Sequence, residues 1–243
     1  MTNQTDIDPF YFRQLLSGRD FAVGDSLASQ MVNYAYLIGD RITRECVLVD
    51  PAYAVDDLVR IAQEDDMTIT GVLASHYHPD HVGSSMMGHT IEGVSALLEN
   101  HHVPIHVNTN EAPWVLRTTG VSESDLCQHS AGDTIMVGNI EVTMVHTPGH
   151  TPGSQCFLAH GCLVSGDTLF LEGCGRTDLP GSDPSLMYES LNMLAQLPDS
   201  TIVFPGHAYS TPPDMLLSDV KATNYVFKPK TREDWMAWFG GAG

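Results

Sequence analysis

The stretch that organises this chain is His76-Tyr77-His78-Pro79-Asp80-His81, which follows directly after the apolar run Gly71-Val72-Leu73-Ala74. Four side chains that can bind a metal ion fall within these six residues, and three imidazoles so close together are hard to explain as packing. In a tight turn after a strand, the first two histidines can point at one ion. Asp80 and His81 can then point at a neighbouring ion as a helix begins. The pattern therefore predicts one short segment that serves two metal ions.

Three further candidate ligands follow along the chain, each just after an apolar run or a glycine-containing turn. His150 lies in the stretch Thr147-Pro148-Gly149-His150-Thr151-Pro152-Gly153, whose Pro-Gly steps restrict where the ring can sit. Asp167 follows an apolar strand pattern, so its carboxylate is expected at a strand end, where it could bridge two ions. His207 follows Ile202-Val203-Phe204-Pro205-Gly206 in the same manner. We expect all four ligand segments to meet at one edge of the sheets.

The donor set indicates which ions this site would take. Neutral imidazole and carboxylate suit zinc, iron or manganese, whereas calcium and magnesium favour shells of oxygen alone. Zinc is the leading candidate, with iron and manganese as alternatives. Two ions a few ångströms apart would lower the pKa of a shared water and would polarise a substrate carbonyl. With coordination positions left open, hydrolysis by a metal-bound hydroxide is the expected chemistry.

Composition excludes several other classes of function. The 243 residues are 42% hydrophobic, enough for a single domain with a substantial core. The formal charge of −19 repels phosphate backbones and anionic membranes, which argues against nucleic-acid and membrane partners. No apolar run approaches the roughly 18 residues that span a bilayer, and the first twelve residues resemble no targeting segment. Five cysteines without a C-x-x-C pair favour a reducing cytoplasm.

The periodicity of apolar residues predicts an α/β fold of two packed sheets with helices outside. Helical spacing occurs at 55–62 and 91–98, and a third helix is expected from the N-cap Asp183 and Pro184 to just before Pro198. We expect one domain over 1–243. It would carry a long insertion at about 82–132, with a helix and a loop over the site, and a short tail at 210–243. Strands are expected at 32–38, 46–49, 71–74, 135–137, 140–145, 155–158, 162–164 and 201–204.

From roughly Tyr34 to Tyr209 the chain resembles the metallo-β-lactamase superfamily, in which the series H-x-H-x-D-H, His, Asp, His occurs in this order on an αββα sandwich. The resemblance implies two divalent metal ions. It implies that the first ion is held by His76, His78 and His150, and the second by Asp80, His81 and His207. Asp167 would bridge the two.

Other segments indicate which branch of the superfamily the chain resembles. Residues 173–181 (GCGRTDLPG) resemble both the glyoxalase II-like thioesterases and the persulfide dioxygenases. The segments 12–15, 36–40 and 47–51 resemble the dioxygenases, whereas Pro205-Gly206-His207-Ala208-Tyr209 resembles the hydrolases. Only 36 residues follow His207, too few for the separate helical domain with which glyoxalase II binds glutathione.

We rank four functions on this basis. The first is a metal-dependent hydrolase of a thioester or ester, similar to hydroxyacylglutathione hydrolases, with a small-molecule substrate such as a glutathione conjugate. The second is a persulfide dioxygenase with one Fe(II) on His76, His150 and Asp167. The third is a lactonase, which the residues 147–155 would also fit. A binding module without activity is disfavoured by the intact ligand set.

Candidate residues beyond the ligands are fewer. Asp80 and Tyr209 are the candidate catalytic residues; the tyrosine could donate to an oxyanion or simply cap the core. Arg176 could hold a substrate carboxylate, or it could form a salt bridge with Asp178. Cys174 is interpreted as packing rather than as a nucleophile. Seven other histidines are interpreted as ordinary surface or core residues (His89, His101, His102, His106, His129, His146, His160). The apolar residues near the end of the chain are interpreted as a docked segment or a homodimer contact (Trp235, Met236, Trp238, Phe239).

Overall fold

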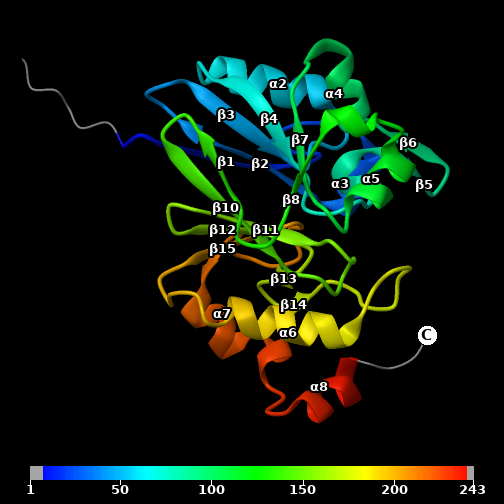
Figure 1. Cartoon of the computed structure of the whole chain (residues 1–243), viewed down its shortest axis with the longest axis vertical. Helices are drawn as coiled ribbons and strands as arrows, with labels where there is room; N and C mark the ends of the chain where they lie inside the picture. Colours follow the sequence, from blue (N-terminus) through cyan, green and yellow to red (C-terminus); the bar gives the residue numbers. More distant parts are fainter. Residues whose placement is uncertain (1–7, 240–243) are drawn as a thin grey trace, which may run out of the picture.

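The computed structural model describes residues 8–239, and in it two six-stranded sheets pack face to face with helices on both outer faces (Figure 1). The αββα sandwich is thereby confirmed. The first sheet has the order β1 (Phe10–Leu16), β2 (Tyr34–Asp40), β3 (Glu45–Val49), β4 (Thr68–Leu73), β7 (Ile105–Asn108) and β8 (Leu126–His129). The second has the order β16 (Met215–Leu216), β15 (Ile202–Pro205), β12 (Cys162–Gly166), β11 (Gln155–Ala159), β10 (Ile140–His146) and β9 (Thr134–Val137).

Parallel pairing in both sheets brings strand ends together at one edge. In the first sheet β3, β4, β7 and β8 are mutually parallel, and in the second β12 is parallel to β15. Parallel neighbours end at the same side of a sheet, so the residues that follow β3, β4, β12 and β15 meet there. This edge carries the candidate ligands.

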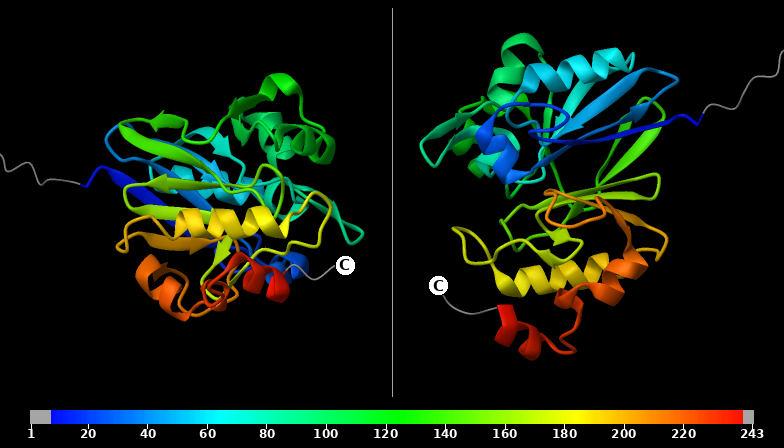
Figure 2. Two further views of the ribbon diagram at one scale, coloured as in Figure 1. Left: turned by 60° about the horizontal axis from the view of Figure 1, so that its bottom comes forward. Right: turned by 180° about the vertical axis from the view of Figure 1, so that it is seen from behind.

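Most of the buried apolar residues form one cluster between the two sheets and one cluster on the outer face of each sheet. Tyr36, Leu73 and Phe157 belong to the apolar cluster between the sheets, and each is almost fully buried. Outside the first sheet, α2 (Val55–Glu64) and α4 (Val94–Asn100) cover a second cluster. Outside the second sheet lie α6 (Pro184–Leu194), α7 (Leu217–Thr223) and α8 (Arg232–Phe239), which Figure 2 shows on the face opposite to α2.

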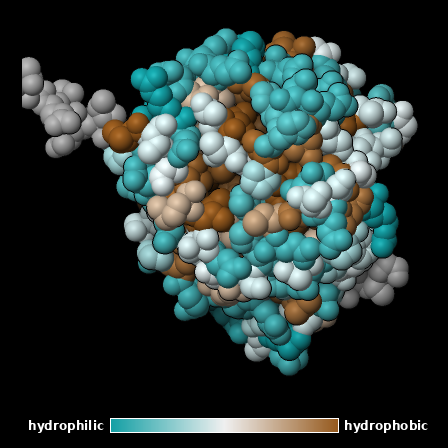
Figure 3. Space-filling view, turned by 45° about the horizontal axis from the view of Figure 1, so that its top comes forward, coloured by the Kyte–Doolittle hydropathy of each residue, from teal (hydrophilic) through white to brown (hydrophobic). Residues whose placement is uncertain are grey.

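The amphipathic pattern of α2 explains its position. It buries Val55, Leu58, Val59, Ile61 and Ala62, which lie along one face of the helix, and exposes the charged residues between them. Each fully buried aliphatic side chain contributes about 1.5–3 kcal/mol through removal from water. On the face drawn in Figure 3, apolar residues gather in a hollow near the middle and hydrophilic residues surround them.

The start of α6 agrees with the sequence prediction. The carboxylate of Asp183 accepts hydrogen bonds from the backbone N–H groups of Ser185 and Leu186, and Pro184 occupies the first helical turn. The helix ends at Leu194, earlier than expected. Backbone bonds three residues back, such as that from Leu197 to the carbonyl of Leu194, tighten the chain before the following proline.

The eight strands expected from the sequence are all present, with bounds that differ by a few residues. Residues 82–132 contain much more regular structure than one helix and a loop. They include the hairpin of β5 (Ser84–Met86) and β6 (His89–Ile91), then α4, β7, α5 (Ala112–Thr119), the 3-10 helix η1 (Glu123–Asp125) and β8. Because β7 and β8 extend the first sheet, much of this segment is part of the sandwich itself.

The helix predicted over 91–98 begins only at Val94. Ile91 pairs with Ser84 in the hairpin, and Gly93 has extended backbone that packs directly against Gly83. A Cβ added at Gly93 would lie 2.1 Å from the carbonyl oxygen of Val82, so this glycine is fixed by the close approach of two backbones.

The remaining elements are short. They are α1 (Ser26–Met31), α3 (Pro79–Val82), β13 (Leu169–Phe170), β14 (Gly173–Cys174) and the 3-10 helix η2 (Tyr225–Phe227). The last described helix, α8, docks on α6 through Trp235, which is 1% exposed and packs against Tyr188. Trp238 is 61% exposed. Between residues 8 and 239, no helix has the length and apolar character needed to cross a membrane.

Candidate metal centre

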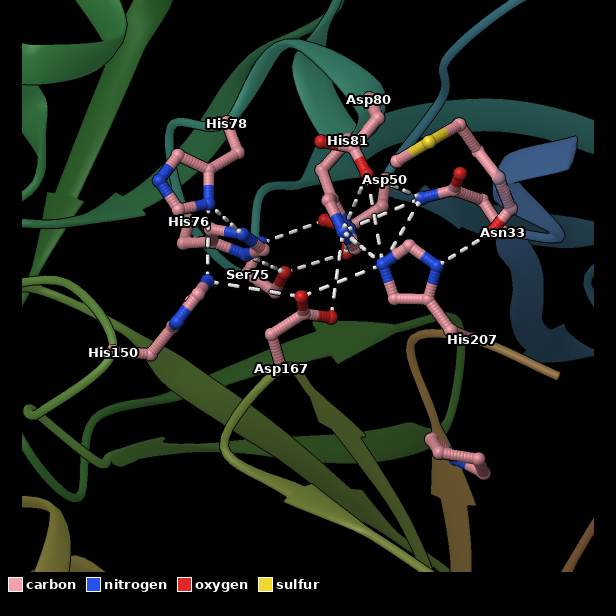
Figure 4. A network of polar contacts seen from close by, with 12 residues as sticks. Asn33, Asp50, Ser75, His76, His78, Asp80, His81, His150, Asp167 and His207 are labelled. Carbon is pink, nitrogen blue, oxygen red and sulfur yellow. Dashed lines mark hydrogen bonds and ion pairs between the residues drawn. The ribbon is translucent and has the colours of Figure 1, made fainter. Parts of the chain in front are cut away.

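All seven ligands predicted from the sequence converge at the edge where the strands end (Figure 4). His76 and His78 lie in the turn after β4, and Asp80 and His81 lie in α3. The other three follow β10, β12 and β15, and they are His150, Asp167 and His207. Two groups have ligand atoms within 4.8 Å of one another. The first triad is His76, His78 and His150, and the second triad is Asp80, His81 and His207.

In the first triad the imidazole nitrogens face a common point. Nδ1 of His78 lies 3.0 Å from Nε2 of His76 and 3.0 Å from Nε2 of His150. The rings are nearly perpendicular to one another, with interplanar angles between 73° and 84°. Three nitrogens so arranged could hold one ion from three directions.

Asp167 lies between the two triads. One carboxylate oxygen, Oδ1, lies 3.4 Å from Nε2 of His81, and the other, Oδ2, lies 3.4 Å from Nε2 of His207. The same Oδ2 is 3.7 Å from Nε2 of His150 in the first triad. Within the second triad, Nε2 of His207 lies 3.5 Å from Oδ2 of Asp80. This is the placement that a bridging carboxylate requires.

The outer nitrogens of the histidines fix which nitrogen faces the centre. Nδ1 of His150 donates to the carbonyl of Arg176 at 2.8 Å, and Nδ1 of His207 donates to the carbonyl of Met31 at 2.8 Å. A carbonyl accepts only, so both rings carry their proton on Nδ1 and turn the lone pair of Nε2 inward. His81 has the same orientation, with Nδ1 2.9 Å from Oδ2 of Asp50.

The two triads differ in electrostatics. Burial and the neighbouring imidazoles lower the pKa of His78 to about 4 and hold that of His76 well below its usual value. These rings are therefore neutral, which is the form that binds a metal. Burial alone would lower the pKa of His81, but the carboxylates of Asp167 and Asp80 outweigh it and raise this pKa to about 10. The carboxylates of the second triad thus stabilise positive charge, and a metal ion bound there would take the place of the proton on Nε2 of His81.

One buried atom tests whether a cation fits. Oδ1 of Asp167 is buried, and apart from the ion-pair contact with Nε2 of His81 at 3.4 Å it has no hydrogen-bond partner among residues 8–239. A buried acceptor without a partner costs about 1–3 kcal/mol, and more when it is charged. A divalent ion between the triads would satisfy this oxygen and the inward lone pairs together. The residues present therefore fit a pair of divalent metal ions.

Comparison with known proteins agrees with this geometry. The family sequence model described as Metallo-beta-lactamase superfamily matches residues 29–207 of this chain. This chain belongs to the metallo-β-lactamase superfamily. The resemblance inferred from the sequence motifs is confirmed, including its glyoxalase II-like and dioxygenase branch.

Several superfamily members are similar over most of the chain. A hydroxyacylglutathione hydrolase of Aeromonas salmonicida is 36% identical over 183 residues, which is 73% of this chain and 62% of that protein. The probable polyketide biosynthesis zinc-dependent hydrolase BaeB of Bacillus velezensis is 28% identical and covers 84% of this chain and 85% of its own length. The chain thus spans about three fifths of the first relative.

Solved structures show the same fold. The crystal structure of ETHE1 from Myxococcus xanthus has a TM-score of 0.77 and 31% identity, and it covers 95% of this chain and 90% of its own. The di-iron-bound form of TTHA1623 has a TM-score of 0.64 and 28% identity, with 80% of this chain and 95% of that one covered.

Asp50 supports the superfamily site but was missed in the sequence. It accepts from the backbone N–H of Ser75 at 2.7 Å, from the hydroxyl of Ser75, and from Nδ1 of His81. The hydroxyl of Ser75 in turn lies 2.9 Å from Nδ1 of His76. Asp50 therefore orients candidate ligands of both triads. Its signal was an aspartate directly after a buried strand, the same pattern that identified Asp167.

Asn33 is a second missed residue. Its amide nitrogen donates to Oδ2 of Asp80 at 3.1 Å, and its carbonyl oxygen accepts from the hydroxyl of Tyr53 at 3.1 Å. The residue is 3% exposed and forms an isolated β-bridge with His207. No sequence pattern marks it, because its position depends on this long-range pairing.

Glu111 links two ligand segments. Its carboxylate accepts from the backbone N–H of Tyr77 at 2.8 Å and from that of Gly153 at 2.7 Å. The side chain therefore connects the turn after β4 to the loop that carries His150. Glu111 is fully buried, and this burial raises its pKa to about 7.

A pocket of about 590 Å³ opens over the two triads. Its polar floor includes His78, Asp80, Asp167 and His207. Much of the wall is apolar and comes from several distant segments (Met31, Met86, Met87, Phe170, Leu179, Tyr225). The hairpin of β5 and β6 thus contributes to the pocket, as a loop over the site was expected to do. An apolar group beside the candidate metal centre is the feature that this pocket can recognise.

Three further candidates line this pocket. Arg176 forms a bidentate salt bridge with Asp178 at 2.8 and 2.9 Å, with its side chain 68% exposed. The ring of Tyr209 stacks on that of His207 at 4.7 Å, and burial raises the pKa of its hydroxyl to about 12. Burial also raises the pKa of Cys174 to about 12, which keeps it a thiol rather than a nucleophilic thiolate.

Proposed function

We propose that this chain is a hydrolase of thioesters that works with two divalent metal ions, held by the first triad, the second triad and the shared carboxylate of Asp167. One observation carries the proposal. Both triads are complete, and they lie together under an open pocket. Zinc is the leading metal, supported by relatives named as zinc-dependent hydrolases, and the di-iron form of TTHA1623 supports iron as the alternative.

The bound ions would supply a water of lowered pKa and would polarise the substrate carbonyl. Side chains of the protein would orient the water and stabilise the charge that develops on the substrate. Asp80, oriented by Asn33, would accept a hydrogen bond from the attacking water as well as bind the second ion. Tyr209 keeps its proton at neutral pH, so its hydroxyl could donate to the negative charge that develops on the carbonyl oxygen.

The pocket supports an acyl thioester with an apolar portion. Met86, Phe170 and Tyr225 offer contact area for this portion beside the metal-binding floor. The relatives named hydroxyacylglutathione hydrolases support a glutathione conjugate as the substrate class. Of the described residues around the pocket, Arg176 alone carries a permanent positive charge. We assign it to a substrate carboxylate, which would compete with Asp178 for the guanidinium.

Persulfide dioxygenation is the second candidate, and the similarity to ETHE1 over 95% of the chain favours it. In that reaction one Fe(II) would use His76, His150 and Asp167. Hydrolysis ranks higher because the dioxygenase would leave the buried second triad without a function.

One experiment separates the two reactions. Zinc-loaded and iron-loaded protein are each given an acylglutathione thioester, with thiol release as the readout, and glutathione persulfide in an oxygen electrode. We expect thiol release without oxygen uptake. Oxygen uptake by the iron form, with no thioester cleavage in either form, would replace hydrolysis by dioxygenation.

A further inference from the structure

A second group of side chains that could hold a metal ion lies on β7 and β8, the last two strands of the first sheet. His106, Cys127 and His129 each place a ligand atom within 4.8 Å of the other two. His106 is paired with Cys127 across the parallel strands, and His129 lies two residues further along β8. Side chains two residues apart in a strand share a face, so all three project to the same side. We call these residues the edge cluster.

The distance between the two histidine nitrogens of the edge cluster is close to the distances in the first triad. Nδ1 of His106 lies 2.8 Å from Nε2 of His129, compared with 3.0 Å for the nitrogen pairs of His76, His78 and His150. The two rings are tilted by 32° with centroids 5.0 Å apart. A hydrogen bond between the rings would explain this pair alone. It would not explain why a cysteine joins them on the same face.

Surrounding residues leave space for one ring and place a carboxylate near the other. A Cβ added at Gly71 on β4 would lie 3.3 Å from Nε2 of His106, so the glycine leaves the space that this ring occupies. The outer nitrogen of His129, Nδ1, lies 3.8 Å from the carboxylate of Asp133, which itself accepts from the backbone N–H of Ser130 at 2.8 Å. A carboxylate behind a histidine is a common arrangement at metal sites.

The edge cluster can be reached from solvent. His106 and Cys127 are only partly buried, so an ion could reach them from solvent.

We propose that His106, Cys127 and His129 form a separate binding site for one zinc-like divalent ion. Two imidazoles and a thiolate are the donors that zinc prefers, and a water would complete a tetrahedral shell. On binding, the Cys127 thiol releases its proton to solvent and its sulfur forms a bond to the ion. The edge cluster shares no residue with the two triads, and the ion would tie the last strand of the sheet to its neighbour.

Cobalt(II) is the most direct probe, because a cobalt–thiolate bond gives a charge-transfer band in the near ultraviolet and imidazole or carboxylate ligands do not. The proposed ligands of the catalytic centre include no cysteine. We therefore expect metal-free wild-type protein to develop this band on cobalt titration, and to bind one more equivalent than Cys127→Ser. The absence of a thiolate band in the wild type would overturn the proposal.

Matched variants identify the source of the band. Cys127→Ser should abolish it, and His129→Gln should weaken cobalt binding at this site by about 100-fold or more, since each ligand carries a substantial share of the binding energy. Cys174→Ser is the control, because Cys174 lines the catalytic pocket. A band that disappears in Cys174→Ser but persists in Cys127→Ser would contradict the assignment. A correctly folded Cys127→Ser is verified by circular dichroism and by unchanged thioester hydrolysis.

Discussion

Substitution of Asp50 by asparagine tests whether this residue organises the metal centre. The native carboxylate accepts from the N–H and hydroxyl of Ser75 and from Nδ1 of His81, and its side chain is 3% exposed. An asparagine keeps the shape but offers one acceptor oxygen, and it turns an N–H₂ group toward one of these donors. The charge-assisted hydrogen bond to His81 contributes about 1.5–3 kcal/mol. We expect zinc affinity at the second triad to fall by about 10–100-fold.

The assay is a zinc titration of metal-free protein in competition with a chromophoric chelator. Asp56→Asn is the matched control, since Asp56 is exposed on α2. The first triad should lose less affinity than the second, because Asp50 reaches His76 only through Ser75. Equal affinities of Asp50→Asn and wild type for both ions would refute the assigned role.

Three further predictions concern single side chains. In Glu111→Gln, a carboxyl with its pKa raised from 4.5 to about 7 is removed. The stability that the protonated carboxyl gives the wild type is complete below pH 4.5 and is lost as the pH rises through 7. Between pH 4.5 and 8 the free energy of unfolding of the wild type should fall by about 3 kcal/mol more than that of Glu111→Gln. Urea denaturation of both proteins at the two pH values measures this difference. Equal changes with pH in the two proteins would contradict the prediction. Arg176→Lys should weaken binding of a carboxylate substrate by about 1–3 kcal/mol without change in metal content. Equal slowing of every substrate, together with poor folding, would instead make Arg176 a structural partner of Asp178. Tyr209→Phe keeps the ring on His207 but should lower kcat by about 10²-fold with little change in KM; an unchanged kcat would show that the hydroxyl does not donate.

The convergence of the seven candidate ligands could be predicted from the sequence because each directly follows a strand or lies in a rigid turn. Such local patterns survive in a one-dimensional sequence. Asn33 and Glu111 could not be predicted, because their contacts join segments far apart in the chain, such as Glu111 with Tyr77 and Gly153. The grouping of the edge cluster could not be predicted for the same reason. His106 and Cys127 become neighbours only when β7 and β8 pair, and these strands lie in a segment expected to be an insertion.

The fold shows the same division between local and long-range information. Apolar runs identified eight strands and the start of α6, which depends on the local pair of Asp183 and Pro184. The predicted start of α4 was wrong because the contact of Gly93 with Gly83 and Val82 is a tertiary contact, which helical spacing alone does not reveal.

The most direct test of the dinuclear hydrolase is the zinc dependence of thioester cleavage. Metal-free Cys127→Ser protein, in which the edge cluster cannot compete, is titrated with zinc while thiol release from an acylglutathione is recorded. We expect the activity to reach its maximum at two equivalents per chain, and Asp167→Ala in the same background to retain neither ion and to remain inactive. Full activity at one equivalent, or no thiol release at any zinc concentration, would contradict the proposed centre.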